Sequence, residues 1–124
     1  MIQGLRTIVY YVTDLDKAKR WYSTVLGEGP YFDEPYYVGF EVGGFELGLV
    51  PAEPGQPTGP GGVGAYWGVP NADAAYARLL ELGATAHSPV EDVGGGIRVA
   101  AVLDPVGNVF GVIENPQFSL EKVR

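Results

Sequence analysis

The sequence contains the same order of predicted elements twice, and this internal repeat limits the folds open to the chain more than any other feature. In each half, a strand-like run of β-branched and aromatic residues precedes a run with helical spacing, and three more strand-like runs follow. The first half contains "IVYYV", "VTDLDKAKRWYSTVLG", a run around Tyr31, "YYVGFEV" and "FELGLV". The second half contains "VGAYWGV", "NADAAYARLLELG", "ATAHSPVEDV", "IRVAAVLD" and "NVFGVIE". The repeat therefore predicts an α+β fold of two β-α-β-β-β modules in tandem.

The segment "PAEPGQPTGPGG", residues 51–62, separates the two modules. It consists almost entirely of turn-forming residues without apolar periodicity, so we predict an exposed linker. Module one then spans residues 1–50, module two spans 63–116, and 117–124 form a tail. A chain of 124 residues fits one domain. The glycines at 43–44 and at 94–96 predict tight hairpin turns.

Each predicted helix has capping residues and an apolar face. In the first, Thr13 and Asp16 resemble a capping box, and Gly27 is typical of a helix end. The second is capped by Asn71. The predicted core-facing residues are Leu15, Ala18, Trp21, Tyr22 and Val25 in the first helix, and Ala72, Ala75, Tyr76, Leu79 and Leu82 in the second.

Composition excludes several classes of partner. The chain has 15 acidic and 8 basic residues and a net charge of −7, which argues against nucleic acid because phosphate contacts require Lys and Arg. Neither a secretory leader nor a segment long enough to cross a membrane is recognisable, so we expect a soluble, cytoplasmic protein. The absence of cysteine excludes thiolate sites and disulfides.

Two stretches carry a resemblance to a known family. The run "VTDLDKAKRWYSTVLG" and the run "DPVGNVFGVIENP", residues 104–116, resemble the vicinal-oxygen-chelate superfamily, which includes glyoxalase I, the bleomycin-resistance proteins and the extradiol dioxygenases. The second run is similar to the family's D-P-x-G-N turn before its last strand. The resemblance implies a curved sheet around a central cup, and a homodimer.

The resemblance also implies four positions for metal ligands, which fall at Thr7, Glu46, Gly64 and Gly111. Only Glu46 has a side chain that ligates a divalent ion, so we expect no metal and no other cofactor. His87 is the single histidine, which argues further against a zinc or iron site. Gly64 and Gly111 then leave open volume for a ligand, although each glycine taken alone also fits a bend in a curved sheet.

The remaining candidates follow from strand alternation. Glu46 lies on the opposite face from Phe45 and Leu47, and it either binds a ligand, acts as a catalytic base, or is an ordinary surface residue. Tyr11 and Tyr66 share the strand parity of Thr7 and Gly64, so they either line a ligand site or fill the cup. The predicted ligand-binding residues are Thr7, Tyr11, Glu46, Gly64, Tyr66 and Gly111.

We interpret the chain as a binding protein for a small organic molecule, neutral or cationic, that works without a metal. It either sequesters a toxic or antibiotic compound, as the bleomycin-resistance proteins do, or performs metal-free chemistry through Glu46 and a tyrosine. The alternative is a metal-dependent lyase, isomerase or dioxygenase resembling glyoxalase I. A structural or protein-interaction module is a third possibility that the predicted cup disfavours.

Overall fold

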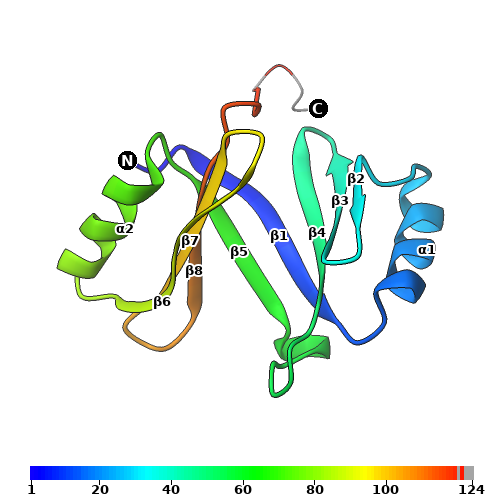
Figure 1. Cartoon of the computed structure of the whole chain (residues 1–124), viewed down its shortest axis with the longest axis horizontal. Helices are drawn as coiled ribbons and strands as arrows, with labels where there is room; N and C mark the ends of the chain where they lie inside the picture. The colour runs from blue at the N-terminus through cyan, green and yellow to red at the C-terminus, as the bar shows by residue number, and fades with distance from the viewer. Residues whose placement is uncertain (120, 122–124) are drawn as a thin grey trace. The chain divides into compact units, whose positions relative to one another are not determined.

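The computed structural model describes residues 1–119 and 121, and it confirms the α+β fold with the β-α-β-β-β order occurring twice (Figure 1). The end of the predicted tail, residues 120 and 122–124, lies outside the described residues. The first set of elements is β1 (Gly4–Val12), α1 (Leu15–Leu26), β2 (Phe32–Glu34), β3 (Tyr37–Val42) and β4 (Phe45–Pro51). The second set is β5 (Val63–Gly68), α2 (Ala72–Glu81), β6 (Thr85–Gly94), β7 (Ile97–Leu103) and β8 (Val109–Glu114). Between the sets lies one short 3₁₀ helix, η1 (Gly59–Gly61).

The chain divides into two compact units. One contains Thr7–Val63, and the other combines Met1–Arg6 with Gly64–Phe118. The first residues of β1 therefore belong with the second half of the sequence. No helix in the part of the chain that the structure describes combines the length and apolar character needed to cross a membrane.

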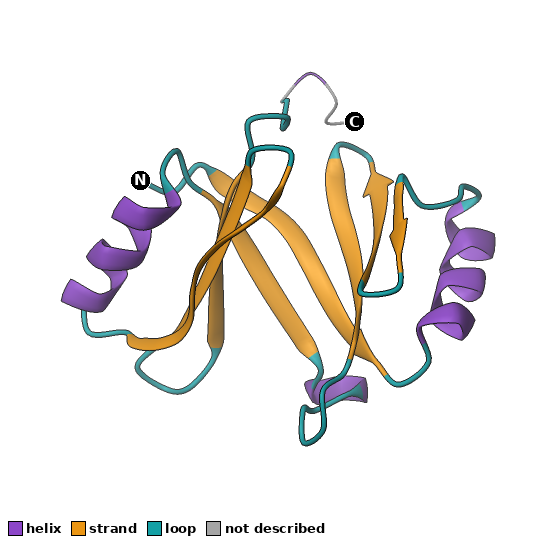
Figure 2. Ribbon diagram, in the orientation of Figure 1, coloured by secondary structure: helices purple, strands orange, loops and turns teal. Residues whose placement is uncertain are grey.

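In the unit that contains Thr7–Val63, the strands are hydrogen-bonded in the order β2-β3-β4-β1. β1 runs parallel to β4, whereas β3 pairs antiparallel with both β4 and β2. The turn between β3 and β4 is the predicted two-glycine hairpin, because Gly43 and Gly44 have φ angles of 60° and 94°, which other residues rarely adopt. α1 lies against β3 and β4 (Figure 2).

The core of this unit is formed by apolar residues on the helix side of the sheet, joined by one face of α1. Its fully buried members are Val38, Phe40 and Leu49, and the packed residues of α1 are Leu15, Ala18, Tyr22 and Leu26. The prediction that Trp21 and Val25 face the core was wrong, because they are 59% and 57% exposed. At about 100° per residue, Trp21 points about a quarter turn away from Tyr22 and misses the sheet.

The capping of α1 also differs from the prediction. Asp14, one residue after the predicted Thr13, is the N-cap, and its carboxylate accepts a hydrogen bond of 3.0 Å from the Lys17 amide. The end at Gly27 is confirmed, with a left-handed φ of 76°. Asp is preferred over Thr at the N-cap, so the prediction was misled by the capping-box spacing between Thr13 and Asp16.

In the unit that contains Gly64–Phe118, the strands are ordered β5-β8-β7-β6, again with a parallel pair (β5 and β8) beside an antiparallel one (β7 and β8). The Asn71 cap of α2 is confirmed by a hydrogen bond of 2.9 Å from the Ala74 amide to the side chain. The core contains Val69, Ala75, Ala100 and Val112, with Tyr76 and Leu79 packed against it. Leu82 was predicted to face this core, but it lies just past the helix end and is 57% exposed.

The D-P-V-G-N segment forms a tight turn before β8. The Asp104 carboxylate accepts hydrogen bonds from the amides of Val106 and Asn108 and from the Asn108 side chain, at 2.9 to 3.0 Å. These bonds, chiefly those from Asn108, lower the pKa of Asp104. The turn leads directly into β8, the strand that contains Gly111.

Candidate functional site

A carboxylate held by two hydroxyl groups lies on the face of the Thr7–Val63 sheet opposite α1. Thr7 on β1 and Glu46 on β4 are directly paired across the parallel strands. The Thr7 hydroxyl donates a hydrogen bond of 2.8 Å to Glu46 Oε1, and Thr7 is only 5% exposed. Strand pairing thus brings together two of the predicted site residues from positions 39 residues apart in the sequence.

Tyr31 supplies the second donor to this carboxylate. Its hydroxyl donates a hydrogen bond to Glu46 Oε2, and its backbone amide donates to the Gly39 carbonyl at 3.0 Å, which fixes the residue just before β2. Burial, the negative charge of Glu46 and the hydrogen bond to it all raise the pKa of the Tyr31 hydroxyl above its ordinary value of 10.0. Glu46 holds the hydroxyl end of Tyr31, while the residue as a whole is 61% exposed.

Two glycines allow tyrosine rings to lie across this face. A Cβ atom at Gly48 would lie 2.7 Å from Tyr37 Cζ, and one at Gly39 would lie 3.1 Å from both Tyr31 Cε1 and Tyr37 Cε2. Any larger residue at these positions would displace a ring. We refer to Thr7, Tyr31, Tyr37 and Glu46 as the Glu46 cluster.

The Glu46 cluster is suited to binding a positive or hydrogen-bond-donating group. Each carboxylate oxygen has two acceptor positions, and the hydroxyls of Thr7 and Tyr31 use one on each oxygen. Aromatic faces beside a carboxylate also attract cations through the ring quadrupole. The sequence prediction missed Tyr31 and Tyr37, and their only signal was the density of aromatic residues around "PYF" and "PYY".

In the matching strand pair of the other unit, β5 and β8, the position that corresponds to Glu46 is a glycine. There Gly111 on β8 is paired with Tyr66 on β5, and not with Gly64. A Cβ atom at Gly111 would lie 2.8 Å from Tyr66 Cδ2 and 2.9 Å from the Ala65 carbonyl oxygen. The expected open volume at Gly111 is therefore wrong, because the Tyr66 ring occupies it. Gly64 itself is buried.

Tyr11 is half-buried, and it lies apart from the Glu46 cluster within its own unit. It is four residues beyond Thr7 on β1, about 13 Å along the strand. There it lines a different pocket together with Trp21 of α1. Its role as a ligand-binding residue stays a prediction, as do those of Gly64, Tyr66 and Gly111.

The residues at the four positions implied for a metal do not fit a divalent ion. Within residues 1–119 and 121, no three His, Cys, Asp or Glu side chains gather in a way that would hold one. Glu46 is the single acidic group at those positions, and both of its oxygens already accept hydrogen bonds. One carboxylate offers too few donors to hold a transition metal.

Comparisons with known proteins place this geometry in context. The family model described as "Glyoxalase/Bleomycin resistance protein/Dioxygenase superfamily" matches residues 4–112. No curated protein matches the sequence.

Solved structures show the same fold at low sequence identity. Methylmalonyl-CoA epimerase from Streptomyces coelicolor, in complex with 2-nitronate-propionyl-CoA, is 17% identical with a TM-score of 0.75, over 96% of this chain and 99% of that one. The Mycobacterium tuberculosis enzyme of the same name is 20% identical with a TM-score of 0.70, over 92% and 89%. A superfamily member from Vibrio splendidus 12B01 is 20% identical with a TM-score of 0.65, over 90% and 99%. At such identities the similarity concerns the fold alone.

Proposed function

Because the chain belongs to the glyoxalase/bleomycin resistance protein/dioxygenase superfamily, whose fold is used for many different activities, we propose its function from the Glu46 cluster. The cluster binds a small organic molecule that is cationic or donates hydrogen bonds, and it does so without a resident metal. The observation that carries this proposal is the Glu46 carboxylate held by the hydroxyls of Thr7 and Tyr31. A carboxylate fixed in this way accepts a further donor with little loss of side-chain freedom.

The hydroxyls of Thr7 and Tyr31 fix the Glu46 carboxylate and leave one acceptor position free on each oxygen, which suits it to hold a donor group of a ligand. The net charge of −7 supports a cationic or neutral ligand over an anionic one at this cluster. Sequestration of a toxic or antibiotic compound is consistent with such a site.

Metal independence is part of the proposal, and it rests on the donor set. The alternative, a metal-dependent lyase, isomerase or dioxygenase, requires ligands that Thr7, Gly64 and Gly111 do not offer. Elemental analysis after dialysis separates the two, because stoichiometric zinc, iron, nickel or manganese would support the alternative.

A homodimer and a cytoplasmic location belong to the same proposal. Light scattering at micromolar concentration tests whether the protein is a homodimer.

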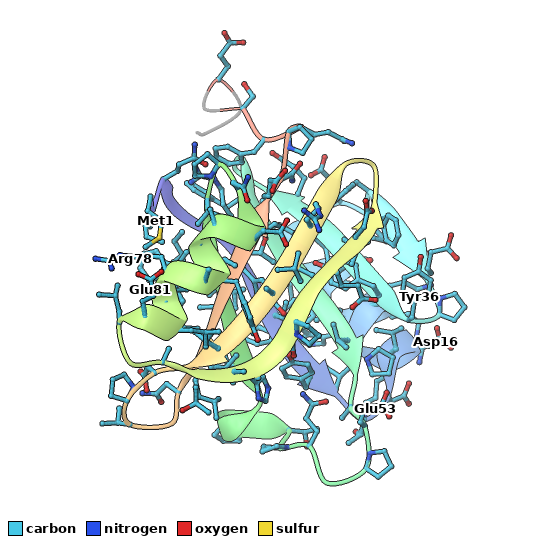
Figure 3. All side chains as sticks on the ribbon, turned by 60° about the vertical axis from the view of Figure 1, so that its left-hand side comes forward. Met1, Asp16, Tyr36, Glu53, Arg78 and Glu81 are labelled. Atoms are coloured by element: carbon cyan, nitrogen blue, oxygen red, sulfur yellow. The ribbon has the colours of Figure 1, made fainter. Side chains whose placement is uncertain are left out.

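The ligand proposal is tested by calorimetric titration with benzylammonium, which combines an aromatic ring with a positive N–H donor. Glu46→Gln should weaken its binding about 10- to 100-fold, because a hydrogen bond to a charged group contributes about 1.5–3 kcal/mol. Glu53→Gln is the matched control, since it removes the same charge from an exposed residue of the linker, which Figure 3 labels. Unchanged affinity in Glu46→Gln refutes the electrostatic role of the carboxylate. If affinity is then lost in Tyr66→Ala, the ligand occupies an aromatic site in the other unit.

A further inference from the structure

An open pocket of about 660 Å³ lies at the other end of β1, within the unit that contains Thr7–Val63. Its lining comes from Tyr11 on β1, the loop that leads into α1, one flank of α1, and Thr58 and Gly59 of the linker. It shares no residue with the Glu46 cluster. This volume falls within the usual range for small-molecule sites.

One wall of this pocket is aromatic. Trp21 is 59% exposed, which is unusual for so large an apolar side chain, and Tyr22 holds it in an edge-to-face contact with ring centroids 4.8 Å apart. Tyr11 adds a second phenol ring to the lining. An accessible indole of this kind offers a stacking surface for a flat apolar group.

The same wall carries two cations, Lys17 and Arg20. Lys17, Trp21 and Thr24 follow the i, i+4, i+7 spacing along one flank of α1, and Arg20 lines the pocket beside them. In the described part of the chain, Lys17 and Arg20 form no ion pair. Lys19, by contrast, pairs with Asp33 at 3.1 Å on another side of the helix.

The one acidic group in the lining is already engaged. The Asp14 carboxylate accepts the hydrogen bond from the Lys17 amide that caps α1, and among the described residues it forms no ion pair with the Lys17 ammonium. Two cations against one carboxylate give the lining a positive balance beside the exposed indole, in a chain of net charge −7. Charge and shape together select a flat ligand with a negative group at its edge.

We propose that this pocket binds a small aromatic carboxylate, with its ring against Trp21 and its carboxylate between Lys17 and Arg20. The site is separate from the Glu46 cluster, and it selects the opposite ligand charge. A chain with both sites can bind one cationic ligand at the Glu46 cluster and one aromatic carboxylate in this pocket at the same time, each independently of the other.

The test uses naphthalene-2-carboxylate, followed by quenching of tryptophan fluorescence, with naphthalene-2-carboxamide as its neutral counterpart. The carboxylate should bind about five- to tenfold more tightly than the amide, and the difference should shrink as salt is raised. Lys17→Gln combined with Arg20→Gln should remove this preference. Arg78→Gln is the matched control, because it removes an exposed cation from α2 in the other unit, where Figure 3 labels it beside its partner Glu81.

Calorimetry provides a readout that does not depend on the indole. Trp21→Ala should weaken binding of the carboxylate about fivefold, and its exposure means that the fold should be unaffected. Glu46→Gln should leave this binding unchanged, which distinguishes the pocket from the proposed function of the Glu46 cluster. Equal affinity for carboxylate and amide, or full affinity in the double variant at Lys17 and Arg20, would overturn the proposal.

Discussion

Replacing Gly111 with alanine tests the packing that most distinguishes the two units. The added Cβ would lie 2.8 Å from Tyr66 Cδ2, 2.9 Å from Tyr66 Cγ and 2.9 Å from the Ala65 carbonyl oxygen. The ring can shift, but the carbonyl belongs to β5, which pairs with β8 beside it. Overpacking of this kind costs about 1–3 kcal/mol. Gly111 has no positive φ, so alanine recovers about 0.4–1 kcal/mol by restricting the unfolded chain.

The net expectation for Gly111→Ala is a loss of about 1–2 kcal/mol in the free energy of unfolding, measured by urea denaturation. The melting temperature should fall by about 4 °C per kcal/mol for a chain of this size. Gly29→Ala is the matched control, because a Cβ there meets nothing within 4 Å and its φ is also not positive. That variant should be as stable as the wild type or slightly more stable.

A double-mutant cycle assigns the cost to the tyrosine ring. In a Tyr66→Ala background, two of the three close contacts of the new Cβ disappear, so Gly111→Ala should cost about 1 kcal/mol less than in the wild type. If Gly111→Ala is as stable as the wild type, the position is open. If its cost is the same in both backgrounds, the ring does not lie over Gly111. Either result would refute the close packing described here.

Two further predictions concern the hydroxyl donors to Glu46. Thr7→Val preserves the shape of a buried residue but removes its hydrogen bond to the carboxylate, so unfolding in urea at neutral pH should show a loss of about 1–2 kcal/mol; no loss would mean that the bond is not formed. Tyr31 has a pKa raised above 10.0 by burial and by Glu46, so the folded state holds this proton more tightly than the unfolded state. Its contribution to stability is complete below about pH 10 and is lost as the pH rises through the folded-state pKa. Between pH 9 and 11, stability should therefore fall more steeply in the wild type than in Tyr31→Phe, and equal slopes would contradict this assignment.

The fold was predictable because its signals are local. Paired glycines at 43–44 determine a hairpin, Asn71 determines the start of a helix, and the order of these signals determines the modules. The face of α1 was harder to predict, because Leu15, Ala18, Trp21, Tyr22 and Val25 form a wide apolar stripe and only contact with the sheet selects part of it. Trp21 belongs to this stripe, so its sequence position alone did not indicate that it lines a pocket instead of the core.

The site was predictable only in part, for a related reason. Strand parity placed Glu46 away from the apolar face, and the family resemblance pointed to Thr7 as well. The contribution of Tyr31 depends on a residue just outside β2 being held by a backbone hydrogen bond to Gly39, which no periodicity reports. The prediction of open space at Gly111 failed because the sequence shows that the side chain is absent there but does not show that the Tyr66 ring packs into its place.

The parallel strand pairs of the two units, β1 with β4 and β5 with β8, carry different residues at the matching positions. Where β1 meets β4, a threonine faces a glutamate and the two form a hydrogen bond; where β5 meets β8, a tyrosine faces a glycine and its ring covers it. The pair Tyr66 and Gly111 is complementary, so a ligating side chain at Gly111 requires the Tyr66 ring to move or to be replaced by a smaller side chain. A carboxylate at Gly111 would therefore fit best together with a smaller residue at position 66. This coupling supports a function based on the single carboxylate at Glu46, which already has its hydroxyl partners in place.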